Sequence, residues 1–263
     1  MKNKSQFHSG RWPKRFGRQQ QKPLQNVFAT RSPALASTFS QALALHQAGR
    51  LAEAEQNYLQ ILKAQPNHFD CLHLLGVIFS QRGNHAEAVR QIDVALKINP
   101  KAASAHNNRG NALRALKRFD EALASFDKAL VLKPDYAEAF NNRGIALKEL
   151  NRFDEALASF DKALVLKLDY AGAFYNRGNA LQELYRVDEA LASYDKAIAL
   201  KPDCAEARFG LCMAELPILY LDEPDIIARR TAYELRLRAL CNAENPATDP
   251  TKDRKSTRLN SSH

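Results

Sequence analysis

The sequence predicts an all-α protein in which antiparallel helix pairs stack into a solenoid, and three observations lead to this prediction. Residues 103–136 and 137–170 are identical at 27 of 34 positions, and residues 171–204 continue the same period. Residues 35–68 and 69–102 fit the same frame with weaker identity. Small residues and prolines recur at fixed places in the units, and 45% of the residues are hydrophobic, enough for a packed core. Five consecutive units indicate a repeat architecture rather than ordinary globular domains.

Each 34-residue unit is expected to hold two helices joined by a short polar turn. In the fourth unit we expect the helices at about 138–150 and 154–167, with the turn at 151–152. The eighth residue is glycine in four of the units, which lets the paired helices approach closely despite the low helix propensity of glycine. These glycines are Gly76, Gly110, Gly144 and Gly178.

Other positions of the unit carry residues suited to a packed helix pair. The twentieth residue is alanine in all five units: Ala54, Ala88, Ala122, Ala156 and Ala190. Large side chains expected to fill the interface are Phe119, Phe126, Phe140, Phe153, Phe160, Phe174 and Tyr194. Proline ends the second helix because it cannot continue the hydrogen-bond ladder, and it stands at Pro66, Pro100, Pro134 and Pro202. Leu168 replaces it in the fourth unit, where a slightly longer helix is expected.

This combination of small residues, aromatic residues, alanine and proline over 34 residues resembles the tetratricopeptide repeat (TPR). The resemblance covers 35–204. It implies a right-handed superhelix whose first helices line a concave groove. Stability in such a stack depends on contacts between neighbouring units and on capped ends.

The chain outside the repeats divides into three further segments. Residues 1–34 are predicted to be a disordered basic arm, and residues 205–243 to form a capping helix and a linker helix. Residues 205–216 resemble the first helix of a sixth unit, and Asp222 or Asp225 is expected to cap a helix that runs to about Leu240. Residues 244–263 are predicted to be a disordered tail.

Helical spacing identifies the residues expected to face the groove. The fifth, ninth, twelfth and thirteenth residues of each first helix share one face, and the sixth residue lies beside them. Candidate peptide-binding residues chosen on this basis are Asn107, Asn108, Asn111, Asn141, Asn142, Lys148, Tyr175, Asn176 and Asn179. Asn108, Asn142 and Asn176, the asparagine row, recur every 34 residues. A carboxamide carries a donor and an acceptor, so such a row suits the backbone of an extended peptide.

Plainer interpretations of these polar residues remain open at this point. The asparagine row is alternatively a set of solvated residues copied when the repeat duplicated. Arg109, Arg143 and Arg177 are expected to act as packing stems whose guanidinium groups reach solvent or a neighbouring acid. A carboxylate clamp would need several groove cations, and only Arg114 and Lys148 qualify.

Several classes of function find no support in the sequence. The four cysteines lack metal-ligand spacing, the seven histidines form no metal motif, and no nucleotide-binding or nucleophile motif occurs. We therefore predict no catalytic residue, no metal and no cofactor for this chain. No apolar run reaches the roughly 18 residues of a membrane-spanning helix. Without a secretory signal pattern, the chain is expected in the cytoplasm.

The net charge of +9 comes from the two ends of the chain. Residues 1–34 contain eight Lys and Arg and no acidic residue, whereas residues 35–251 are nearly neutral. A basic arm of this kind binds nucleic acid or anionic membrane in some proteins, but it is more often a solvated tail. Nucleic acid is therefore an improbable partner.

The segment after the repeats carries a second resemblance. The stretch LPILYLDEPDIIARRTAYELRLRAL at 216–240, following the repeats, is similar to the linker of bacterial SPINDLY-like proteins, relatives of protein O-linked N-acetylglucosamine transferase. The asparagine row corresponds to the asparagine ladder of that family. The resemblance implies that the repeats present acceptor proteins to a glycosyltransferase region that uses UDP-N-acetylglucosamine. No position of this chain matches that catalytic region.

Three functions are compatible with these observations. The first is acceptor recognition for such a glycosyltransferase, with acceptor or client proteins bound as extended peptides. The second is a self-contained TPR scaffold or co-chaperone, and the third is RNA or membrane association through residues 1–34. Self-association through the helix at 225–240 is also expected, because its apolar surface is broad.

The last residues have an unusual origin in this interpretation. Residues 253–263, DRKSTRLNSSH, correspond to codons that resemble a widely used short-read sequencing adapter. We expect them to be a read-through product, and the natural protein to be longer than this chain.

Overall fold

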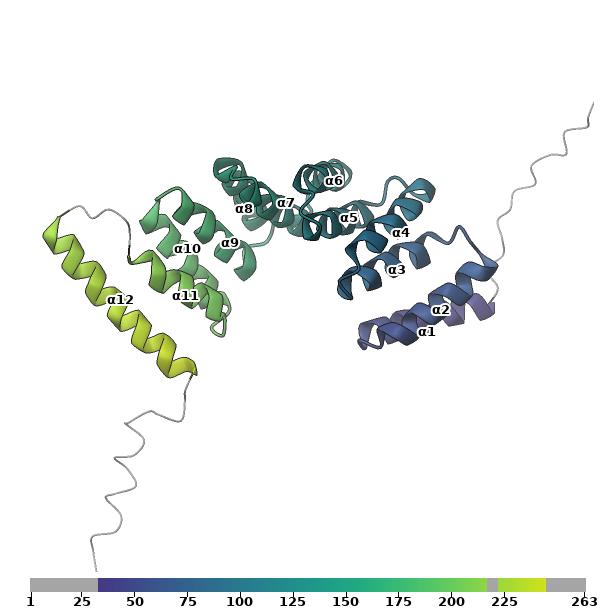
Figure 1. Ribbon diagram of the computed structural model, residues 1–263, viewed down its shortest axis with the longest axis horizontal. Helices are drawn as coiled ribbons and strands as arrows, with labels where there is room; N and C mark the ends of the chain where they lie inside the picture. Colours follow the sequence, from purple (N-terminus) through teal and green to yellow (C-terminus); the bar gives the residue numbers. More distant parts are fainter. Residues whose placement is uncertain (1–32, 217–221, 245–263) are drawn as a thin grey trace, which may run out of the picture.

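The computed structural model describes residues 33–216 and 222–244. These residues form twelve α-helices and contain no strand. Figure 1 shows the helices stacked into an arched solenoid with α1 and α12 at its two ends, which confirms the predicted all-α repeat architecture. Among the described residues, no helix combines the length and the apolar character that crossing a membrane requires. The helices are α1 (Pro33–Gln47), α2 (Leu51–Ala64), α3 (Phe69–Gln81), α4 (His85–Ile98), α5 (Ala103–Ala115), α6 (Phe119–Leu132), α7 (Ala137–Glu149), α8 (Phe153–Leu166), α9 (Ala171–Glu183), α10 (Val187–Leu200), α11 (Ala205–Ala214) and α12 (Glu223–Glu244).

The helix ends differ from the predicted ones in small ways. Both helices of the fourth unit begin and end one residue earlier than expected. The lengthening expected at Leu168 is wrong: α8 has 14 residues, like α6, and the backbone N–H of Lys167 closes it on Ala163. Residues 33, 34 and 244 belong to α1 and α12 rather than to disordered ends. The rest of the predicted arm and tail, including residues 253–263, lies outside the described residues.

Close contact between a glycine and a ring sets the separation of the two helices in each central unit. A Cβ atom added to Gly144 would lie 2.5 Å from Cε1 of the fully buried Phe160. The same relation joins Gly110 to Phe126, and Gly178 to Tyr194 at 2.6 Å. The alanines at the twentieth position of the unit are all 0% exposed, so the second helix also presents a flat surface here. These contacts confirm the predicted role of the small residues.

The turn inside each unit uses the left-handed backbone region. The fifteenth residue has a φ of 75° at Gly49 and 79° at Gly83, where glycine adopts this conformation at little cost. In the next three units the same position is Lys117, Asn151 and Tyr185, with φ of 59°, 58° and 57°. Side chains with a Cβ atom are strained there. The repeat geometry therefore overrides local preference at this position.

Charged residues hold α12 against the last repeat. Glu215, which is 4% exposed, accepts from Arg236 at 2.9 Å and lies 3.8 Å from Arg229. Arg229 also pairs with Asp225 on its own helix and with Asp188 at the start of α10. Asp222 caps α12 by accepting from the backbone N–H of Asp225 at 2.9 Å, one of the two caps that the sequence suggested. A buried carboxylate between two guanidinium groups makes removal of either partner costly.

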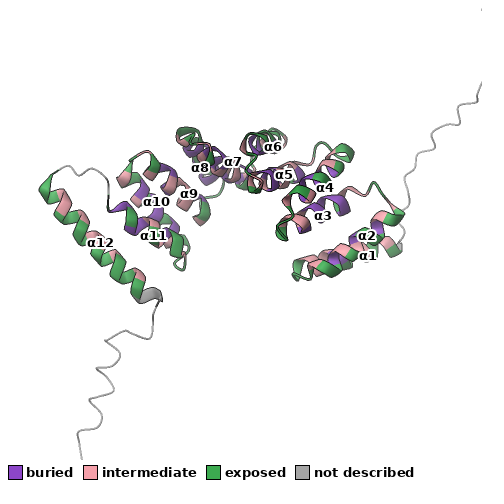
Figure 2. Cartoon of the chain, viewed as in Figure 1, coloured by how far each residue is buried: buried purple, intermediate pink, exposed green. Residues whose placement is uncertain are grey.

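The outward surface of α12 is less well packed. Figure 2 shows exposed and intermediate residues along it, in contrast to the buried residues inside the stack. Ile227 is 60% exposed and Leu235 is 70% exposed. The expected self-association through this helix therefore stays a prediction.

Substitution of alanine at two glycines tests the glycine–ring contact. We expect Gly144→Ala to lower the free energy of unfolding by about 1–3 kcal/mol, because the buried Phe160 ring must shift to admit a methyl group. Gly172, in the exposed first turn of α9, is the matched control, since an added Cβ atom lies 3.5 Å from Tyr170, an ordinary contact. Gly172→Ala should be neutral or stabilising by roughly 0.5–1 kcal/mol. Urea denaturation followed by circular dichroism measures both, and equal effects would contradict the packing argument.

Candidate functional site

The inner face of the arch is lined by the first helix of each unit. Helices α3, α5, α7, α9 and α11 contact one another in succession, and each also packs on the second helix of its own or the preceding unit. Figure 1 shows α3, α5, α9 and α11 toward the inside of the arch and α4, α6, α8 and α10 toward the outside. We call the first helices the inner helices. The candidate residues from the sequence all lie on them.

The asparagine row is tied from one unit to the preceding one. Asn142 Nδ2 donates to Asn107 Oδ1 at 3.0 Å, and Asn176 Nδ2 donates to Asn141 Oδ1 at 2.9 Å. Asn108 Nδ2 lies 2.9 Å from His73 Nε2, where a neutral imidazole accepts. Each carboxamide of the row therefore uses one N–H internally. Its oxygen and its second N–H make no hydrogen bond to another side chain within 33–216 and 222–244.

Two of the candidate residues lie in the interface between units rather than on the groove surface. Asn107 and Asn141 are each 5% exposed, and each accepts the hydrogen bond from the row. Helical spacing places them on the groove side, but the following inner helix covers them. Their structural role is to orient the asparagine row. The involvement of the row itself in binding stays a prediction.

The remaining candidates line the inner helices and are partly exposed. Tyr175 packs its ring 6.1 Å from that of Tyr194, and Asn179 Oδ1 accepts from the Tyr194 hydroxyl at 2.8 Å. Asn111 and Lys148 have intermediate exposure. Nothing in the described residues shows a ligand on any of them, so their binding role also stays a prediction.

Sequence reasoning interpreted the Arg109, Arg143 and Arg177 series as packing stems near a neighbouring acid, and the structure confirms this. Arg143 Nε donates to Asp127 of the preceding unit at 2.7 Å, and its other nitrogen donates to Ser159 of its own unit at 2.7 Å. Arg109 and Arg177 repeat the arrangement with equivalent partners. These arginines tie successive units together through Nε and one terminal nitrogen.

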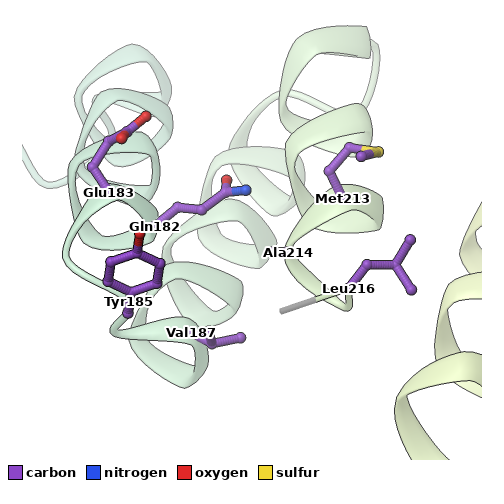
Figure 3. A pocket seen from close by; sticks show the side chains of 7 residues that line it. All are labelled: Gln182, Glu183, Tyr185, Val187, Met213, Ala214 and Leu216. Carbon is purple, nitrogen blue, oxygen red and sulfur yellow. The ribbon is translucent and has the colours of Figure 1, made fainter. Parts of the chain in front are cut away.

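A cleft that the sequence did not predict lies at the C-terminal end of the inner face. It has a volume of about 210 Å³ between the end of α9, the start of α10 and the end of α11. Figure 3 shows Tyr185 and Gln182 on one side of it and Met213 and Leu216 on the other. Tyr185 is 72% exposed. Its backbone lies in the left-handed region, with a φ of 57°. The lining is mixed: Gln182 and Glu183 are polar, whereas Val187, Met213, Ala214 and Leu216 are apolar.

The described residues contain no cluster suited to a metal ion, and their cysteines form no disulfide. No group of three or more His, Cys, Asp and Glu is placed to hold a metal ion there. All four cysteines are free. Burial raises the pKa of the Cys71 thiol to about 12, and burial also raises the pKa of Cys212. Both buried thiols therefore stay protonated and unreactive at neutral pH.

The fold and the inner face together define a helical-repeat scaffold that presents polar side chains at a 34-residue period. Four family models agree with this class. Models described as tetratricopeptide repeat match residues 45–109, 137–170 and 171–204, and one described as TPR repeat matches residues 110–151. Together they span more than half of the chain. The chain belongs to the tetratricopeptide repeat family.

Solved structures share the fold at low sequence identity. PilW, a type IV pilus biogenesis factor, is 20% identical with a TM-score of 0.71, and the match covers 83% of this chain and 96% of PilW. The pilF protein of Pseudomonas aeruginosa is 18% identical with a TM-score of 0.68 over 85% of this chain and 97% of its own. YrrB, a TPR protein with an unusual peptide-binding site, is 25% identical with a TM-score of 0.54 over 65% and 88%. Among curated proteins, none matches the chain.

The buried His73 gives the row a predictable response to acid. Burial lowers the pKa of His73, and the Asp70 carboxylate opposes this to a smaller extent. The unfolded chain therefore binds a proton more readily than the folded one. The stability contributed by neutral His73 is complete above about pH 6.5 and is lost as the pH falls toward the lower folded pKa.

We expect His73→Asn to reduce this acid sensitivity. The variant places at this position the same acceptor that Asn107 and Asn141 provide to the next units. The melting temperature should fall less between about pH 7.5 and about pH 5 in the variant than in the original protein. Thermal melts by circular dichroism at both pH values measure the difference, and parallel losses would exclude His73 as the responsible group.

Proposed function

We propose that this chain is a protein–protein interaction module that holds an extended peptide segment of its partner along the inner helices. The observation that carries the proposal is the asparagine row, in which each carboxamide is oriented by a hydrogen bond to the preceding unit. An oriented carboxamide keeps an acceptor and a donor for the ligand without the entropic cost of ordering them on binding.

Recurrence of the row once per unit suits a peptide backbone rather than one particular side chain. A main chain offers alternating N–H and C=O groups whatever its sequence, and a carboxamide satisfies both. The likeness to YrrB, which has a peptide-binding site by its own description, supports the same mode. Binding of this kind needs no cofactor and no metal.

More specifically, the bound segments belong to the acceptor proteins of a glycosyltransferase, and this enzyme is related to protein O-linked N-acetylglucosamine transferase. The similarity of residues 216–240 to the linker of SPINDLY-like proteins supports this proposal, together with the asparagine row. The linker helix α12 is packed on the last repeat through Arg229 and Arg236. UDP-N-acetylglucosamine would be the donor for the catalytic region, and the alternative is a scaffold or co-chaperone without enzymatic function. The proposed setting is the cytoplasm.

Removal of the asparagine row tests the interaction function. A random peptide library panned against the protein supplies the ligand, and fluorescence anisotropy gives its Kd. The combined variant Asn108→Ala, Asn142→Ala, Asn176→Ala should bind at least about tenfold more weakly, since each lost hydrogen bond is worth roughly 1 kcal/mol.

Two exposed carboxamides on α2, the second helix of the first unit, provide the matched control. Gln56→Ala with Gln60→Ala should leave the Kd unchanged. Melting temperatures of both variants establish that each is folded at the temperature of the binding assay. Unchanged affinity in the triple variant would refute a role for the row.

The glycosyltransferase proposal has a separate test. An antibody raised against residues 33–216 captures the native protein with its associated polypeptides from its source cells. We expect the captured material to transfer N-acetylglucosamine from radiolabelled UDP-N-acetylglucosamine to co-captured proteins. Absence of transfer, when an added active transferase labels the same proteins, would favour the scaffold function.

A further inference from the structure

The terminal helix α12 differs from the other helices in how it is packed. Each helix from α1 to α11 contributes at least one buried apolar residue to the stack. Within α12, none of residues 223–241 is buried, and all are either exposed or of intermediate exposure. The large apolar side chains of Ile227 and Leu235 are 60% and 70% exposed. Apolar burial, which holds the repeats together, therefore contributes little to the attachment of α12.

The face of α12 that meets the repeats is charged instead. Arg229 and Arg236 lie on this face two helical turns apart. Both reach the carboxylate of Glu215, Arg236 at 2.9 Å and Arg229 at 3.8 Å, and the Glu215 side chain is only 6% exposed. Arg229 also lies 3.3 Å from Asp188 on α10. Charge pairing is therefore the main contact between α12 and the stack.

Arg236 takes the place of an arginine that the repeats lack at their C-terminal end. Inside the stack, Asp161 of one unit pairs with Arg177 of the next at 2.7 Å. The equivalent aspartate of the last unit is Asp195, and the equivalent of the arginine on α11 is Leu211. Arg236 supplies the missing charge, but its Nη1 lies 4.0 Å from Asp195 and has no hydrogen-bond partner among the described residues, although it is buried. Because an unpartnered buried donor costs stability, α12 fits this end less well than one repeat fits the next.

The contact of α12 with the repeats covers the end of α11. Cys212 is 1% exposed, and its thiol lies 3.9 Å from the backbone carbonyl oxygen of Tyr233 on α12. We call the surface beneath α12, formed by Asp188, Asp195, Cys212 and Glu215, the end surface. Its three carboxylates complement the two arginines of α12. The end surface therefore suits a helix that carries two arginines two turns apart.

We propose that α12 is a releasable cap on the end surface, and that a partner helix with two arginines two turns apart competes with α12 for it. Release breaks the ion pairs of Arg229 and Arg236, while the apolar contacts between the repeats remain. The cost of breaking these pairs is partly offset, because the separated charges return to water. Such a local opening is independent of global unfolding. The cap is also independent of peptide binding along the inner helices, because the asparagine row is not part of the end surface.

Thiol labelling of the full chain tests release of the cap. Iodoacetamide modifies each cysteine as it becomes accessible, and mass spectrometry gives the rate, which is divided by the rate in urea-unfolded protein. Cys212 reports release of α12, and Cys71, which is 0% exposed in the repeats, reports opening of the stack. We expect Cys212 to react at least about tenfold faster than Cys71. Equal rates would overturn the proposal, because α12 would then leave only when the stack opens.

Charge reversal on the two faces of α12 provides a variant and its matched control. Arg229→Glu with Arg236→Glu places two carboxylates against Glu215, and should speed labelling of Cys212 at least about tenfold while Cys71 is unchanged. Arg230→Glu with Arg238→Glu makes the same change of charge on the exposed face of the same helix. This control should leave the Cys212 rate within about twofold of the original. Equal Cys212 rates in the two variants would contradict attachment by ion pairs.

A fluorescent peptide of residues 222–244 serves as the competing helix. By fluorescence anisotropy, it should bind the Arg229→Glu, Arg236→Glu protein at least about tenfold more tightly than the original protein, whose own cap occupies the end surface. The same peptide with both arginines changed to glutamine should bind the released protein at least about tenfold more weakly. Equal affinity of the peptide for the two proteins, or of the two peptides for the released protein, would overturn the competition.

Discussion

The close approach of the two helices inside each unit is the contact on which this solenoid depends. Glycine at the eighth position admits a buried ring, Phe126, Phe160 or Tyr194, to a distance that no Cβ atom would allow. This contact, together with the fully buried alanines of the second helix, sets how closely the two helices of a unit pack. A repeat protein propagates such a geometry along its length because each unit packs only on its neighbours.

Polar ties between units convert that stack into a rigid inner face. The guanidinium groups of Arg109, Arg143 and Arg177 join an aspartate of one unit to a serine of the next. The asparagine row, on the inner helices, donates to an acceptor of the preceding unit in the same way. Satisfied networks of this kind specify one arrangement of the helices. They also leave a regular set of oriented polar groups on the surface proposed for the peptide.

Departures from the repeat mark the places where the units differ in what they offer a ligand. The third unit has Phe126 where the fifth has Tyr194, and this difference leaves Asn111 and Arg114 without internal partners. After the last unit, α11 is followed by α12 instead of a regular second helix, and Glu215 holds α12 through Arg229 and Arg236.

Most of the fold follows from the sequence alone, because the 34-residue period, the glycine and alanine positions and the Asp222 cap are local signals. The candidate site follows from it only in part. Helical spacing put Asn107 and Asn141 on the groove side, yet the next inner helix buries both. Spacing also gave no sign that Arg114 lacks a partner, or that Leu168 leaves α8 at its usual length. Sequence periodicity determines which face of a helix a residue occupies. Only the tertiary structure decides which group, some 35 residues away, covers it, because that depends on the angle at which successive units stack.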